Sequence, residues 1–133
     1  PYQLTFSALN KDYRYFKSQS SFPPDGLPRM NGGAVSISGA VMPIDPPPEN
    51  GEMSRFWLAN PTVVMAGCVF CNPPTLADLI YVESTDEPLK VDREELYRGV
   101  MVLRVLGRFF VEQAKTEDGV EYLFRMEMKE SEN

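Results

Sequence analysis

Clustered prolines are the feature that most restricts how this chain can fold. Its 133 residues include 12 prolines, and several stand together at Pro23-Pro24, Pro46-Pro47-Pro48 and Pro73-Pro74. Because proline lacks a backbone N–H and cannot continue a helix or an inner sheet ladder, these clusters must be connections. The segments between them are short, which favours short β-strands joined by irregular loops over a helical bundle.

Five segments between these connections have the apolar patterns of β-strands. In the first, Val35, Ile37 and Val41 fall on one face of an extended chain. The strands that we expect are Ala34–Met42, Ser54–Ala59, Leu79–Glu83, Gly99–Val111 and Val120–Met128. The turn signal Glu117-Asp118-Gly119 predicts that the last two strands form a hairpin. Gly39 and Gly107, inside two of the strands, predict sharp bends.

The pattern as a whole predicts an all-β (mainly β) domain: a small five-stranded barrel of the oligonucleotide/oligosaccharide-binding (OB) type. A plain β-sandwich is the alternative, and a closed barrel has the advantage of leaving no exposed strand edges. We expect an N-terminal arm over 1–31 packed on the core, the barrel over 32–130 and a tail over 131–133. At most one short helix is expected, over Val91–Tyr97 with Asp92 as its N-cap. Leu4–Leu9 is expected to form only one helical turn or a short strand.

Charge and composition exclude several classes of function. The net charge of −6 leaves few cations to neutralise phosphates, so binding to nucleic acid is disfavoured. The chain has no histidine, which rules out Ser-His-Asp and Cys-His catalysis and histidine-based metal sites. With no catalytic constellation in view, we expect a protein that is not an enzyme. The longest nearly apolar stretch, Val63–Cys71, is shorter than the roughly 20 residues that span a bilayer.

The only two cysteines, Cys68 and Cys71, lie in the segment Gly67–Pro74 and are the best candidates for any chemistry. A structural role, as a local disulfide or as half-buried thiols that stiffen the loop, is one interpretation. A thiol–disulfide redox role is another. Such enzymes place the first cysteine at the start of a helix, whereas Pro73-Pro74 prevents a regular helix from continuing here.

A metal site at Cys68 and Cys71 is a further interpretation. Two thiolates suit zinc or copper, but zinc normally takes four ligands. The missing ligands would come from a partner or from side chains of this chain, namely Asp78, Glu83, Met42 or Met65.

Two other groups of residues have both a functional and a structural interpretation. Met126 and Met128 match a copper-binding Met-x-Met pair, but alternate positions on one strand favour core packing. The strand aromatics, a candidate stacking platform for a ligand, are expected to form the core because the chain is acidic. They are Phe56, Trp57, Tyr81, Phe109, Phe110, Tyr122 and Phe124.

Three segments resemble a bacterial envelope family of unknown function, family thirty-two ninety-nine among domains of unknown function. They are Met30–Pro43, Arg55–Leu58 and the cysteine- and proline-containing stretch from Gly67 to Val82. The resemblance implies one OB-type barrel that is exported to the periplasm, often as a lipoprotein, and sometimes encoded near metal-transport systems. Because the chain begins at Pro1, we expect an upstream segment, for which a signal peptide is one candidate.

The chain departs from the family pattern beside its cysteines. Val69 and Phe70 stand where relatives commonly have a second cysteine or a histidine, and Ala77-Asp78 stands where many have an asparagine. The resemblance therefore extends to Cys68 and, among the prolines, to Pro73 and Pro74.

Together these observations predict an exported accessory module that presents the loop Gly67–Pro74 to a partner protein. Cys68, Cys71, Pro73 and Pro74 are its expected binding residues, no cofactor is required, and an envelope transport system is a candidate partner. The alternative is a periplasmic metal-handling protein that binds zinc or copper through Cys68 and Cys71, with Asp78 as a further ligand. A redox protein is the third hypothesis.

Overall fold

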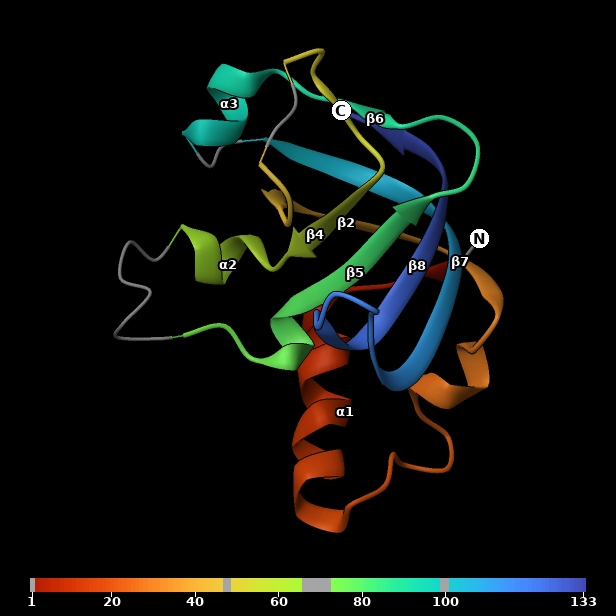
Figure 1. Ribbon diagram of the computed structural model, residues 1–133. Coiled ribbons are helices and arrows are strands. Elements are labelled where there is room, and N and C mark those ends of the chain that lie inside the picture. The colour runs from red at the N-terminus through yellow and green to blue at the C-terminus, as the bar shows by residue number, and fades with distance from the viewer. Residues whose placement is uncertain (1, 47–48, 66–72, 99–100) are drawn as a thin grey trace.

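Five strands close into a small β-barrel (Figure 1). The computed structural model describes residues 2–46, 49–65, 73–98 and 101–133. The barrel strands are β2 (Gly33–Pro43), β4 (Arg55–Ala59), β5 (Leu79–Ser84), β7 (Val102–Lys115) and β8 (Glu121–Glu132). They follow the order β2-β4-β5-β8-β7, and β7 pairs again with β2 to complete the ring. The β5–β8 pair is parallel, and the four other barrel pairs are antiparallel.

Three helices, two 3-10 turns and three two-residue strands surround this barrel in the described part of the chain. The helices and turns are α1 (Phe6–Gln19), α2 (Pro61–Val64) and α3 (Arg93–Tyr97), with the 3-10 turns η1 (Leu27–Met30) and η2 (Leu76–Asp78). The remaining strands are β1 (Tyr2–Gln3), which pairs with β2, and β3 (Glu52–Met53), which pairs with β6 (Leu89–Lys90). None of the described helices has the length and apolar character that a membrane crossing requires.

The structure confirms the predicted fold class, and the five barrel strands lie where the apolar patterns placed them. The last two strands form the predicted hairpin, with Gly119 at a φ of +91° in its turn. The two strand glycines serve close approaches of the backbone. A Cβ at Gly39 would lie 2.8 Å from the carbonyl oxygen of Ala59, and one at Gly107 would overlap the carbonyl oxygen of Glu127. The barrel therefore closes only because these positions lack a side chain.

The expectation of at most one short helix was wrong. α3 forms as predicted, with the Asp92 carboxylate accepting from the backbone N–H of Glu94 and Glu95. The expected turn at the N-terminus, however, is the 14-residue helix α1. Thr5 caps its start by accepting from the N–H of Ala8 at 3.1 Å, which supplies a partner for one of the free donors of the first turn.

Helix α1 covers one end of the barrel, the lower end in Figure 1. Phe6 and Leu9 on its inner face belong to the same buried cluster as the barrel interior. Its buried carboxylate, Asp12, accepts from the backbone N–H of Leu27 at 2.7 Å and so ties α1 to η1. The N-terminal residues thus contribute to the core, while the predicted boundary between residues 31 and 32 stays a prediction.

The barrel interior holds alternate residues of each strand. Phe56, Phe109 and Phe124 are fully buried, and the rings of Phe109 and Phe124 stack at 5.8 Å. Met126 and Met128 also point into the core, with 0% and 5% of their surface exposed. The core interpretation therefore accounts for both methionines and for these three aromatic residues, whereas Trp57, Tyr81, Phe110 and Tyr122 lie on the outer side of the sheet.

The packing of α1 against the barrel leads to a test of stability. Leu9 is completely buried, so Leu9→Ala should lower the free energy of unfolding by about 2–5 kcal/mol, because it leaves a cavity between helix and barrel. Tyr15→Ala, at an exposed position of the same helix, serves as the control and should change it by less than about 0.5 kcal/mol. Urea unfolding followed by tryptophan fluorescence measures both. Equal effects of the two substitutions would mean that α1 does not belong to the cooperative core.

Candidate functional site

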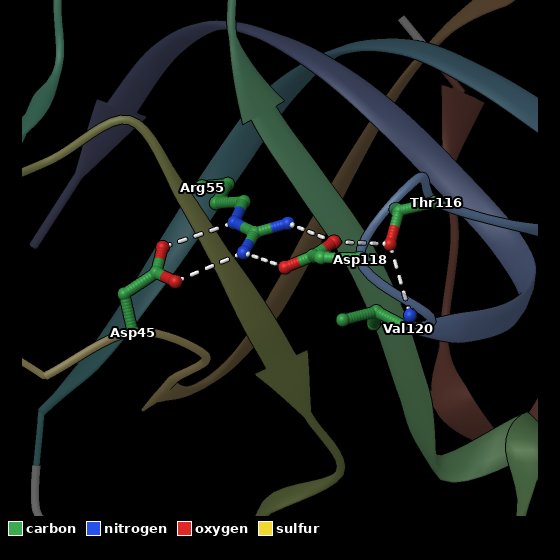
Figure 2. A network of polar contacts seen from close by, with 5 residues as sticks. All are labelled: Asp45, Arg55, Thr116, Asp118 and Val120. Carbon is green, nitrogen blue, oxygen red and sulfur yellow. Dashed lines mark hydrogen bonds and ion pairs between the residues drawn. The ribbon is translucent and has the colours of Figure 1, made fainter.

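One arginine joins the two loops that border the outer face of β4 and β5. Arg55, at the start of β4, binds both carboxylate oxygens of Asp45 at 2.9 Å and both of Asp118 (Figure 2). Asp45 lies in the connection between β2 and β4, and Asp118 lies in the turn between β7 and β8. Thr116 completes the network, because its hydroxyl donates to Asp118 at 2.6 Å and accepts from the N–H of Val120. We call these three charged residues the Arg55 clamp.

The clamp keeps its charges over a wide pH range. Hydrogen bonds from Arg55 lower the pKa of both Asp45 and Asp118 below the ordinary value of 3.8. The same hydrogen bonds raise the pKa of Arg55 above its ordinary value. The guanidinium uses four of its five N–H donors on the two carboxylates, and the clamp as a whole carries a net charge of −1.

Cross-strand pairing arranges the outer face of the sheet in two rows. One row runs through Trp57, Tyr81, Arg125 and Phe110, each paired with the next on the neighbouring strand. Trp57 meets Tyr81 edge to face at 6.0 Å, and Tyr81 stacks on Tyr122 at 5.0 Å. These rings therefore pack on one another, and Tyr81 is only 4% exposed.

The second row is charged and contains Arg55, Glu83, Glu127 and Arg108. Arg125, in the aromatic row, lies over the ring of Phe110 at 4.2 Å. Its guanidinium contacts three glutamates, Glu112 at 2.7 Å, Glu127 at 3.1 Å and Glu83 at 3.8 Å. Burial alone would lower the pKa of Arg125, but the hydrogen bonds that it donates to Glu112 and Glu127 outweigh burial and raise that pKa.

This outer face is where OB barrels usually bind oligonucleotides and oligosaccharides, between the loops that follow the first and fourth strands. Here the clamp ties those two loops together across the sheet. Carboxylates also outnumber arginines on the face, so a phosphate backbone would meet net negative charge. The arginines Arg55 and Arg125 of this face are already engaged in ion pairs, and the absence of nucleic-acid binding stays a prediction.

An apolar pocket of about 300 Å³ opens at another place, between α2 and α3. Val63 and Val64 from α2, Leu79 from β5 and Leu96 from α3 line it, together with the end of β2. Its size and apolar walls match those of small-ligand sites in other proteins. We call this cavity the α2–α3 pocket.

Each short helix beside the pocket begins with a side-chain cap. The Asn60 side chain accepts from the N–H of Thr62 at 3.2 Å and starts α2, and Asp92 starts α3 in the same way. Two large apolar side chains near the pocket, Met65 after α2 and Tyr97 on its rim, are 62% and 67% exposed. Exposed apolar groups beside an apolar cavity are typical of interaction sites.

Asp78 lies in the wall of the pocket and connects three segments of the fold. Its Oδ1 accepts from the side-chain amides of Asn10 on α1, at 3.1 Å, and of Asn60, at 3.2 Å. Its Oδ2 accepts from the backbone N–H and the hydroxyl of Thr75 at 3.0 and 3.2 Å. Burial by itself would raise the pKa of Asp78, but these hydrogen bonds outweigh it and hold that pKa below 3.8. Asp78 is thus a buried, charged anchor of the structure.

The structure brings some of the predicted site residues together. Pro74 and Asp78 both line the α2–α3 pocket, as does Met42, whereas Pro73 is exposed. Glu83 lies elsewhere, on the outer face beside Arg125. Cys68 and Cys71 lie outside the described residues, and so does most of the loop Gly67–Pro74. Within the described ranges, no group of three acidic or cysteine side chains is placed to hold a metal ion.

Sequence reasoning missed the Arg55 clamp and the pocket wall at α2. Arg55 and Asp118 are 63 positions apart, and no local pattern pairs them. The clamp is recognisable only once the hairpin turn is placed beside the start of β4.

The comparisons with known proteins define the class of the fold. No protein-family model matches the chain, and the search of curated proteins finds no match either. The crystal structure of a DUF3299 family protein from Pseudomonas aeruginosa PAO1 is similar, with a TM-score of 0.63 and 22% sequence identity. The alignment covers 99% of this chain and 95% of that one. The two proteins therefore share a fold over their whole length, and the neighbour belongs to a family whose function is unknown.

The Arg55 clamp predicts a specific dependence of stability on pH. Asp45 and Asp118 have lowered pKa values in the folded state, so their contribution is present above pH 3.8 and is lost as the pH falls through the folded-state values. Arg55→Met removes this contribution. The variant should therefore be less stable than the wild type at neutral pH, and the difference should shrink at a pH of about 3 and below. Thermal unfolding across this range measures it, and a difference that does not change with pH would contradict the assignment.

Asp78 gives a second stability test. Asp78→Ala leaves the amides of Asn10 and Asn60 and the N–H of Thr75 without their acceptor, so the free energy of unfolding should fall by about 2–4 kcal/mol. Asp86→Ala, in the exposed connection after β5, is the control and should cost less than about 0.5 kcal/mol. Urea unfolding compares the two. A small effect at Asp78 would show that the buried network does not hold α1 and α2 in place.

Proposed function

We propose that this protein is a non-enzymatic binding module of the OB type that docks a partner protein at the α2–α3 pocket. The pocket is the observation that carries the proposal, because it is apolar and of ligand size. Val64 and Pro74, which flank the cysteine-containing segment in sequence, both line the pocket. The outer sheet face is the weaker candidate, because its arginines and aromatic rings already bind each other.

The size of the pocket limits the occupant. A volume of about 300 Å³ accommodates one large apolar side chain of a partner. Burying such a side chain contributes about 1.5–3 kcal/mol, which is too little for a stable complex alone. Further contacts with the exposed side chains of Met65 and Tyr97 would add to it, so the interaction is of the weak, reversible kind.

The proposal places the module in the bacterial envelope. Its support is the likeness of three sequence segments to an exported lipoprotein family of unknown function, together with a shared fold with a DUF3299 family protein. On this proposal the chain belongs to that family, is exported to the periplasm and works beside an envelope protein. A lipid anchor and a partner among transport systems stay predictions.

Metal handling and thiol redox chemistry stay predictions as well, because both depend on Cys68 and Cys71. Asp78, the third candidate ligand for zinc or copper, has a structural role that accounts for its burial. A metal ion at Asp78 would have to displace the hydrogen bonds from Asn10, Asn60 and Thr75. No observation on the described residues favours either alternative over partner binding.

Photo-crosslinking in the source organism tests the docking site. A benzoylphenylalanine at position 97, on the rim of the pocket, should capture a discrete partner protein. The same group at position 15, on α1 at the far end of the barrel (Figure 1), should not. Val64→Gln, which makes a pocket wall polar, should abolish the crosslink, because the apolar contact is lost.

The matched control is Val102→Gln. Val102 is also a valine and is 41% exposed, but it does not line the pocket, so the crosslink should persist in this variant. A partner captured equally well from positions 15 and 97, or a crosslink that survives Val64→Gln, would exclude the pocket as the docking site.

A further inference from the structure

We infer that the α2–α3 pocket selects an apolar group that carries a positive charge, such as an apolar side chain next to a lysine or an arginine of the partner. The inference rests on the proposed function and adds the chemistry of the occupant. Two uncompensated negative charges lie at or beside this pocket, Asp78 in its wall and Glu95 on helix α3, and most of the other side chains that line it are apolar.

Asp78 supplies the charge in the wall. It is only 6% exposed, and the groups that donate to its carboxylate, from Asn10, Asn60 and Thr75, are all neutral. Among the described residues no basic side chain lies within ion-pair distance of it. Neutral donors stabilise the ionised carboxylate but leave its net charge in place, and low-polarity walls screen that charge less than water does.

Helix α3 supplies the second charge through Glu95, which precedes the pocket-lining Leu96 in sequence. Arg98 lines the pocket, but its guanidinium is paired with Glu94 at 3.1 Å, so this pair adds no net charge. Arg93 lies over the ring of Tyr97, and its one positive charge equals in number the one negative charge of the N-cap Asp92. Glu95 remains, exposed and without an ion pair among the described residues. The pocket therefore combines an apolar lining with a negative field, which a cationic apolar group complements in both respects.

Three probes with the same phenyl body and different charge test the inference on the unmodified chain. They are phenethylamine, phenethyl alcohol and hydrocinnamate, which are cationic, neutral and anionic at neutral pH. Methyl NMR titration at Val63, Val64 and Leu79 reports binding in the pocket. The amine should bind about threefold to tenfold more tightly than the alcohol, and the carboxylate more weakly than the alcohol. Raising the salt concentration to about 0.5 M should reduce the preference, because part of the field comes from the exposed side chain of Glu95.

The outcomes separate this inference from the proposed function. If the three probes bind equally well, or the carboxylate binds best, the inference about charge is wrong while the apolar pocket stands. If no probe perturbs the pocket methyls, both the inference and the proposed function fail.

A conservative variant measures the contribution of Glu95 without threatening the fold. Glu95→Gln changes only an exposed side chain of α3 and should weaken binding of the amine by about twofold to threefold, with binding of the alcohol unchanged. Glu130→Gln, at an exposed position of β8, is the control and should alter neither. An equal loss of amine binding in both variants would mean that only the overall charge of the protein is being sensed, and would overturn the inference.

Discussion

Closure of the barrel through β2 is the constraint on which the rest of the structure depends. This one strand pairs with β7 along most of its length and with β4 at its end, and the two glycines of β2 and β7 permit the close backbone contacts that closure requires. Once the ring is complete, the turn between β7 and β8 must lie near the start of β4, where Arg55 bonds to it. The same closure sends the chain from β4 into α2 and from β5 toward α3, and so forms the pocket between these helices.

The two outer regions of the barrel have opposite character. On the sheet face, aromatic rings stack on one another and each of two arginines is surrounded by carboxylates. The charged and aromatic side chains of that region are therefore already paired with each other. At the α2–α3 pocket, apolar side chains line a cavity and large apolar groups remain exposed. Covering an exposed apolar surface with a ligand lowers the free energy of the system. We therefore propose that recognition takes place at the pocket, away from the face that OB barrels generally use.

The sequence predicts those parts of the structure whose determining residues lie close together in the chain. The five barrel strands and their hairpin were predictable, because alternating apolar residues and a Gly-containing turn act over a few neighbouring positions. The Asp92 cap of α3 was predictable for the same reason. Helix α1 was missed because its segment is mostly polar, although Phe6, Leu9, Tyr13 and Phe16 recur at helical spacing and supply a usable signal. The clamp and the pocket were not predictable, since they join residues that only the closed barrel brings together.

The most direct test of the account is whether the α2–α3 pocket is a real apolar cavity in the protein. Crystals of the chain pressurised with xenon measure this, because xenon enters apolar cavities of sufficient size without needing a polar partner. The account predicts a xenon atom between the side chains of Val64, Leu79 and Leu96. A pocket without xenon and filled by the chain's own side chains would contradict it.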